Sequence, residues 1–99
     1  NLGVNYETRG RSDLAILAYR IALGYAPRPT DLQLYASIAT RLAYCLLQTR
    51  PRAASLAYLR DAAQQARGGD EAAVLRWVAD QLARDPAQFA ALAIPRLGG

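Results

Sequence analysis

The sequence lacks several residue types on which catalytic chemistry depends. Its 99 residues include no histidine and a single cysteine, Cys45. One cysteine cannot form an intrachain disulfide, and without histidine a cysteine–histidine nucleophilic pair is impossible. The spacing of cysteine and carboxylate residues matches no metal site, and no glycine-rich phosphate loop follows a strand. We therefore expect no enzyme activity, no metal and no cofactor.

Long apolar runs and strand patterns are missing as well. No apolar stretch approaches the roughly 20 residues that cross a bilayer. β-branched residues are few, and strict alternation of apolar and polar residues is absent. The hydrophobic share of 53% is inflated by alanine, which favours helix. We predict an all-α chain without a membrane span, in which Cys45 is a buried structural thiol within the apolar stretch 42–47.

Lysine is also absent, so all twelve basic residues are arginines, and the net charge is +4. The guanidinium group of arginine binds carboxylates and phosphates in a bidentate manner, so an anion-binding surface is one alternative. The arginines are scattered, however, and the densest pairs are Arg9 with Arg11 and Arg50 with Arg52. A GC-rich bacterial genome accounts for the same composition, and nucleic-acid binding is disfavoured because no extended basic cluster is present.

Proline, glycine and capping residues divide the chain into six predicted helices. Their expected ranges are about 1–9, 13–25, 31–48, 51–66, 70–84 and 86–92. The residues expected at their ends are Gly10 after the first, Ser12 or Asp13 before the second, Thr30 or Asp31 before the third, Pro51 in the first turn of the fourth, Gly68 and Gly69 at the end of the fourth, and Asp70 as the cap of the fifth.

Apolar residues at helical spacing mark the faces that we expect to be buried. In the third predicted helix these are Leu34, Ile38, Leu42 and Cys45, with Tyr35, Ala39 and Leu46 beside them. In the fifth they are Val74, Leu75, Val78 and Leu82, with Trp77 adjacent. Phe89 and Leu92, three residues apart, are expected to share the buried face of the sixth.

The most specific pattern lies between residues 2 and 27. It runs Leu2-Gly3-x2-Tyr6, then Gly10, then Ala15-x3-Tyr19-x2-Ala22-Leu23, and then Pro27. This pattern resembles one tetratricopeptide repeat, a helix–turn–helix unit of about 34 residues. The resemblance implies antiparallel helix pairs stacked as a right-handed α-solenoid. It also implies that Gly3 allows the second helix to approach closely and that Pro27 turns the chain toward the next unit.

The rest of the chain follows that pattern less closely. Ala36 and Ser37 stand at the Leu-Gly positions if the second repeat begins at residue 30, and its second helix then comes about five residues late. The series Ala54-x3-Tyr58-x3-Ala62 echoes Ala15-x3-Tyr19. We expect a single domain over residues 1–99, with repeats at 1–29, 30–68 and, in part, 69–99, that is a fragment of a longer array.

In tetratricopeptide arrays the first helices of successive repeats line a groove that binds a peptide or a partner's helix. The resemblance places five residues of this chain in that groove: Glu7, Thr8, Asp31, Tyr35 and Arg41. Leu34 and Ile38 lie nearby but are expected to pack in the core. Chaperone-binding repeats hold a carboxylate with lysine and asparagine. Because lysine is absent and Val4 and Ile38 replace the asparagines, that clamp is not expected.

These features together predict a non-catalytic scaffold segment that recruits a partner protein. The composition also resembles the periplasmic arrays of outer-membrane exopolysaccharide-export proteins of the Pel and cellulose systems, which implies the periplasmic side of the outer membrane. The alternatives are a structural spacer within a longer array, and an anion-binding surface for nucleic acid or acidic polysaccharide. Exposed repeat ends also predict self-association of this segment.

Overall fold

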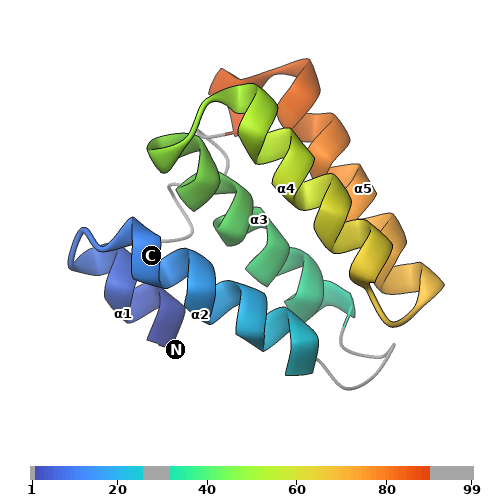
Figure 1. Ribbon diagram of the computed structural model, residues 1–99, viewed down its shortest axis with the longest axis horizontal. Helices are drawn as coiled ribbons and strands as arrows, with labels where there is room; N and C mark the ends of the chain where they lie inside the picture. Colours follow the sequence, from blue (N-terminus) through green and yellow to red (C-terminus); the bar gives the residue numbers. More distant parts are fainter. Residues whose placement is uncertain (1, 26–31, 90–99) are drawn as a thin grey trace.

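Five helices and a short helical turn make up the part of the chain that the computed structural model describes, residues 2–25 and 32–89 (Figure 1). The helices are α1 (Leu2–Thr8), α2 (Ser12–Tyr25), α3 (Leu32–Thr49), α4 (Arg52–Gln65) and α5 (Gly69–Arg84), and the turn spans residues 86–89. These residues contain no strand, which confirms the prediction of an all-α chain. Each observed helix end lies within one residue of the predicted end.

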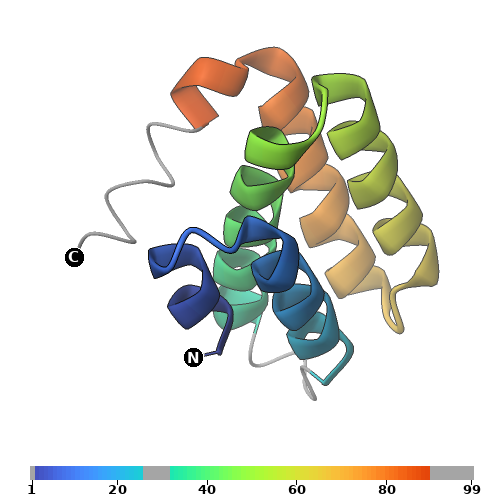
Figure 2. The same ribbon diagram turned by 60° about the vertical axis from the view of Figure 1, so that its left-hand side comes forward.

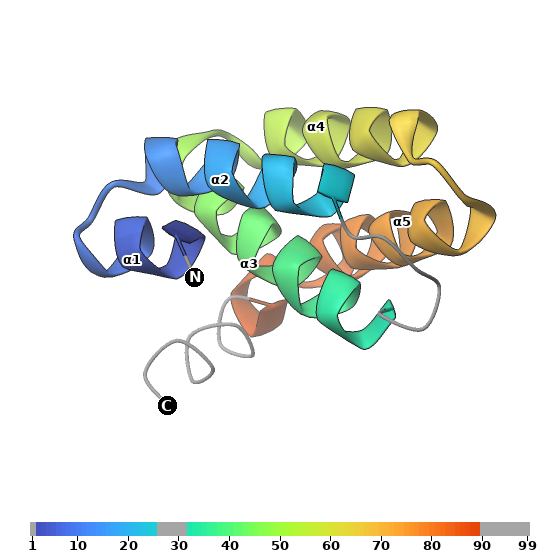
Figure 3. The ribbon, with the colours of Figure 1, turned by 90° about the horizontal axis from the view of Figure 1, so that it is seen from below.

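The helices alternate in direction and lie in two layers. One layer contains α1, α3 and α5, and the other contains α2 and α4 (Figure 3). α3 packs extensively against α2 and α5, α5 also packs against α4, and α1 packs against α2. α3 packs only lightly against α4, which follows it directly. In the turned view, α5 lies between α3 and α4 (Figure 2), and every extensive contact joins helices that are one or two positions apart in sequence.

Two glycines position α1 against α2. Gly10 has a φ of +75°, the left-handed conformation predicted for the end of the first helix. A Cβ atom on Gly3 would lie 2.5 to 2.8 Å from three carbons of the Tyr19 ring, which leaves no room for a side chain. The close approach expected at Gly3 is therefore confirmed. The turn expected at Pro27 lies outside the described residues.

The junction of α4 and α5 differs from the prediction. The C-cap of α4 is Ala66, with φ −66° and ψ 145°, and neither Gly68 nor Gly69 has a positive φ. Because Ala66 already takes an extended conformation, α4 ends without a left-handed glycine. Gly68 is instead the N-cap of α5, and Asp70, the predicted cap, lies in the first turn. The assignment of both caps was wrong, although an acidic residue in the first turn still favours the helix.

The cap of α2 was predicted at Ser12 or Asp13, and this was wrong, because both residues lie inside the helix and the carbonyl of Arg11 accepts the first hydrogen bond, from the amide of Ala15. The start of α4 is one residue from expectation. Pro51 is the residue just before α4, and its carbonyl oxygen accepts hydrogen bonds from the amide and the hydroxyl of Ser55 at 3.0 and 3.1 Å. α2 begins at Ser12, whose hydroxyl donates to Oε1 of Gln48 on α3 at 3.3 Å, and Asp13 lies in its first turn. The cap predicted at Thr30 or Asp31 falls outside the described residues.

The buried core repeats along the chain with an offset of forty residues. Gly3, Ala15, Tyr19 and Leu23 are buried in α1 and α2, and the residues forty positions later, Ala43, Ser55, Leu59 and Ala63, are buried in α3 and α4. The counterparts of Leu2 and Gly3 are therefore Leu42 and Ala43, six residues after the predicted Ala36 and Ser37. Tyr58, predicted as the counterpart of Tyr19, is only half-buried, because Leu59 takes that position.

The predicted core faces are largely confirmed. Ile38, Leu42 and Cys45 are buried on α3, and Leu75, Val78 and Leu82 are buried on α5. Leu34 was predicted in the core but is 56% exposed, since it stands at the edge of the buried stripe in the first turn of α3. Phe89 is buried as predicted, and Leu92 lies outside the described residues.

Candidate interaction groove

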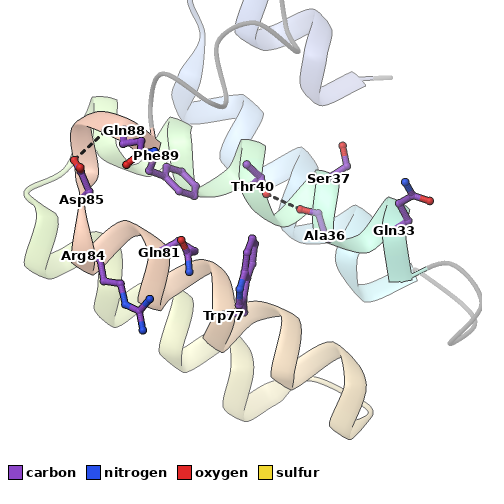
Figure 4. A pocket seen from close by; sticks show the side chains of 10 residues that line it. All are labelled: Gln33, Ala36, Ser37, Thr40, Trp77, Gln81, Arg84, Asp85, Gln88 and Phe89. Atoms are coloured by element: carbon purple, nitrogen blue, oxygen red, sulfur yellow. Dashed lines mark hydrogen bonds between the residues drawn. The ribbon is translucent and has the colours of Figure 1, made fainter.

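A cavity of about 640 Å³ opens between α3, α5 and the helical turn at residues 86–89 (Figure 4). We call it the α3–α5 groove. Its lining residues are Gln33, Ala36, Ser37 and Thr40 from α3, Trp77, Gln81 and Arg84 from α5, and Asp85, Gln88 and Phe89 from the segment after α5. The volume falls within the roughly 300–1,000 Å³ that is typical of ligand pockets. The space is therefore large enough for several side chains of a bound peptide.

Two aromatic side chains dominate the apolar part of the groove. The indole of Trp77 points toward α3 across the opening (Figure 4) and is 56% exposed. Phe89 is 6% exposed, so it forms the floor rather than the rim. Tryptophan is highly buried on average. A half-exposed tryptophan beside a cavity is therefore suited to anchor a partner.

Asp85 brings Phe89 back toward α3. Its carboxylate Oδ1 accepts a hydrogen bond from the amide of Gln88 at 3.0 Å, and its carbonyl oxygen accepts one from the amide of Phe89 at 3.0 Å (Figure 4 draws the first of these). These bonds begin a new helical turn immediately after α5 ends. The turn closes one end of the groove.

The polar lining of the groove is rich in primary amides. The side chains of Gln33, Gln81 and Gln88 make no hydrogen bond within the described part of the chain. The hydroxyl of Thr40, by contrast, donates to the carbonyl of Ala36 at 2.8 Å. Each free amide offers both donors and an acceptor, so it matches the alternating groups of a peptide backbone.

Charge in the groove is limited to one end. Arg84 and Asp85 lie there, and the carboxylate of Asp85 caps the following turn. The only ion pair within 4.0 Å among the described residues joins Arg11 and Asp13, at 3.3 Å, so Arg84 has no ionic partner there. The groove therefore offers one unpaired cation beside a largely neutral surface.

Glu7 and Thr8, predicted as groove residues, lie on α1 and do not line this cavity. The hydroxyl of Tyr19 donates to Oε1 of Glu7 at 2.5 Å, and the hydroxyl of Thr8 donates to the carbonyl of Asn5 at 2.9 Å. Burial and the bond to Glu7 together raise the pKa of Tyr19. Burial, and next the charge of Glu7, raise the pKa of Cys45 to about 12. Glu7 thus joins α1 to α2 and α3, and Cys45 is the buried thiol that was predicted.

Tyr35 and Arg41, which were also predicted in the groove, do not line this cavity. Tyr35 is 4% exposed and belongs to the core, and the pKa of its phenol is raised by burial and then by the charge of Glu71. It lines a separate cavity of about 180 Å³. Arg41 is half-buried outside the α3–α5 groove. Asp31 lies outside the described residues. The face of α3 assigned to the groove is therefore mostly the face that packs in the core.

The residues that do line the groove follow a pattern that is visible in the sequence. Gln33, Ser37 and Thr40 form a neutral polar stripe at i, i+4 and i+7 on α3. Trp77 stands one position off the buried stripe of α5. A polar stripe on one helix and a tryptophan outside the apolar stripe of the next are the features that indicate this surface.

Comparison with known proteins gives no relative: no protein-family model, no curated protein and no solved structure matches this chain. Within residues 2–25 and 32–89, no group of three or more carboxylate or thiol side chains is arranged to hold a metal ion. None of the described helices is long and apolar enough to cross a bilayer.

Proposed function

We propose that this chain is a non-catalytic protein-interaction segment built as a tetratricopeptide-like, right-handed helical array, and that its α3–α5 groove binds a peptide segment of a partner protein. The two-layer arrangement of α1, α3 and α5 against α2 and α4 supports the array (Figure 3). The forty-residue repetition of buried positions supports it as well. Stacked repeats of this kind bind extended partners along one layer.

The observation that carries the proposal is Trp77, 56% exposed beside a cavity of about 640 Å³. Leaving a large aromatic surface in water is unfavourable for a free protein, and covering it in a complex removes that cost. The unbonded amides of Gln81 and Gln88 lie on the same surface. A partner peptide that inserts an apolar side chain beside Trp77 and pairs its backbone with these amides satisfies both kinds of group.

A catalytic role is not supported by the groups on this surface. Arg84 and Asp85 are the only charged residues among the described residues that line it, and Asp85 is engaged in the turn that follows α5. Cys45 is buried outside the groove, and its raised pKa keeps the thiol protonated at neutral pH.

The resemblance in composition to the arrays of exopolysaccharide-export proteins extends the proposal to a context. In that context the partner is a component of polysaccharide export on the periplasmic side of the outer membrane. Purified periplasmic polysaccharide-modifying enzymes are expected to bind the immobilised chain, and failure of all of them to bind counts against this context without affecting the groove.

The groove is tested with short random peptides displayed on phage and selected on the immobilised chain. Trp77→Ala is expected to weaken the selected peptides by about tenfold or more, because truncating a central aromatic anchor has an effect of that size. Ile21→Ala is the matched control, since Ile21 is 59% exposed on α2 in the other layer.

Selected peptides that bind W77A as well as the original chain contradict the groove assignment. If I21A abolishes binding instead, the partner surface lies on α2. If no peptide is enriched, the spacer alternative replaces the recognition proposal.

A further inference from the structure

The layer that lacks the groove carries the surplus of positive charge. Residues 50–67, which contain α4, include four arginines and one carboxylate, Asp61. Residues 69–85, which contain α5, include two arginines and four carboxylates. None of the arginines in 50–67 forms an ion pair within the described part of the chain. The segment around α4 therefore carries a net positive charge, whereas the segment around α5 carries a net negative charge.

Two arginines of this layer are held against one aromatic ring. The guanidinium carbon of Arg20, on α2, lies 5.5 Å from the centre of the Tyr58 ring on α4, and that of Arg50 lies 5.0 Å from the same centre. The two guanidinium carbons therefore lie near each other, separated by no more than the sum of their distances from the ring centre. The negative face of an aromatic ring attracts a guanidinium and restricts its movement.

A hydrogen bond fixes Arg20 further. Its Nη2 donates to Oε1 of Gln65, seven residues after Tyr58 on α4, at 3.0 Å. Arg20 therefore bridges α2 and α4, two helices of the same layer (Figure 3). A cation whose position is set before binding loses less entropy when it takes a ligand.

Nearby carboxylates do not neutralise this pair. Asp61 accepts a hydrogen bond from Nε2 of Gln65 at 3.2 Å, so it reaches Arg20 only through that amide. Glu71 lines the 180 Å³ cavity together with Arg20 but forms no ion pair with it. Two like charges fixed near one ring repel each other, and an anion placed beside them relieves that repulsion.

We propose that Arg20, Arg50 and Tyr58 form a binding site for the carboxylates of an acidic peptide segment. A guanidinium donates two parallel hydrogen bonds to a carboxylate, which gives such a pair both strength and orientation. A nucleic-acid backbone needs a row of successive phosphate contacts. The remaining arginines of this region, Arg52, Arg60 and Arg67, are separated by seven or eight residues and provide no such row. The site is independent of the α3–α5 groove.

The experiment measures binding of a fluorescently labelled polyglutamate peptide to the full chain by anisotropy. Arg20→Gln and Arg50→Gln are each expected to weaken binding by about tenfold, the loss typical of one charged hydrogen-bonding partner. Arg60→Gln is the matched control, because Arg60 is exposed on α4 and contacts no aromatic ring. Asp61→Asn is expected to strengthen binding, since it removes a negative charge that is bonded to Gln65, the partner of Arg20.

Arg20→Lys separates charge from geometry. The lysine keeps the positive charge but lacks the planar guanidinium group that forms two parallel hydrogen bonds. Binding is therefore expected to be intermediate between that of the original chain and that of R20Q. Circular dichroism of each variant shows whether the helices are retained, and the comparison of R20K with R20Q stands even if both lower the melting temperature equally.

Three results overturn the proposal. The first is absence of polyglutamate binding to the original chain. The second is equal weakening by R60Q and R20Q, which shows a diffuse charge effect. The third is tighter binding of a single-stranded oligonucleotide than of polyglutamate, which assigns the surface to nucleic acid. Trp77→Ala is expected to leave polyglutamate binding unchanged, so failure of this site and failure of the groove are distinguishable.

Discussion

The first helix pair, α1 with α2, and the second, α3 with α4, fill matching positions with side chains of different size. Gly3 lies against Tyr19 in the first pair, while Ala43 and Leu59 stand at these positions in the second. Glu7 accepts the hydrogen bond of Tyr19, and its counterpart forty residues later is Leu47, which packs partly buried against the core. One pair therefore combines a very small residue with a large polar one, and the other uses two aliphatic residues.

We infer from the matching burial of these positions that neighbouring residues compensate for one another's size, although α3 packs more lightly against α4 than α1 does against α2. A core at crystal-like density tolerates exchange of volume between adjacent positions better than change at one position alone. The second pair also omits the buried polar contact, because a leucine at each position leaves no donor or acceptor to satisfy. Substitutions in the first pair test whether it tolerates the residue combination of the second.

The largest expected effect contrasts Leu42 with Leu2. Leu42 is fully buried, whereas its counterpart Leu2 is 61% exposed. Leu42→Ala is expected to lower the free energy of unfolding by about 2–5 kcal/mol, the usual range for a buried leucine. Leu2→Ala is expected to change it by no more than about 0.5 kcal/mol. Urea unfolding followed by circular dichroism measures both, and equal losses would contradict the expected effect of the difference in burial between the two positions.

The next effect concerns the glycine in the first pair. Gly3→Ala places a Cβ into the Tyr19 ring and is expected to cost about 1–3 kcal/mol, as overpacking does. Adding Tyr19→Leu recreates the small-with-aliphatic combination of Ala43 and Leu59. The double variant is expected to be more stable than G3A alone, and a further loss of stability would contradict the compensation.

A double-mutant cycle on Glu7 and Tyr19 tests the polar contact. Glu7→Leu leaves the Tyr19 hydroxyl without its partner and is expected to cost about 1–2 kcal/mol. Glu7→Leu with Tyr19→Leu copies Leu47 and Leu59 and is expected to cost less than the sum of the single changes. Additive losses would mean that the hydrogen bond contributes no coupling.

The last effect is absent at neutral pH and develops only in alkaline solution. Burial raises the pKa of Cys45 to about 12 from 9.0, so the unfolded chain loses this proton at lower pH than the folded chain does. Stability is therefore expected to fall as pH rises above about 9, and Tyr19, with a raised pKa, adds to the same trend. Urea unfolding at neutral and alkaline pH measures the fall. Cys45→Ala is expected to reduce it, and an unchanged slope would show that Cys45 does not contribute.

Local sequence patterns were sufficient to predict the helices and most of the core. Glycine at residue 10 ends α1 as predicted, and proline at residue 51 marks the start of α4, although it stands one residue before the first turn in which it was expected. Gly3 was expected to let the second helix approach closely, and its position against the Tyr19 ring confirms this. Such features depend on neighbours within a few turns of helix.

The candidate groove could not be predicted in the same way. Which face of α3 is buried depends on where α2 and α5 pack, and α3 begins several residues before the position that matches the first pair. The predicted Tyr35 consequently lies in the core, while Gln33 and Thr40 line the groove. The exposure of Trp77 does follow from its place one position off the buried stripe of α5, whereas the position of Phe89 depends on the turn that begins at Asp85, which local periodicity does not specify.

The order of packing along the chain has a consequence for how the molecule opens. α1 is seven residues long and packs chiefly against α2, whereas α3 is held on two sides by α2 and α5. Chains whose contacts connect near neighbours lose structure in segments, beginning with the least supported end. Amide hydrogens of α1 are therefore expected to exchange with deuterium before those of α3, so that the first helix opens many times for each complete unfolding of the chain.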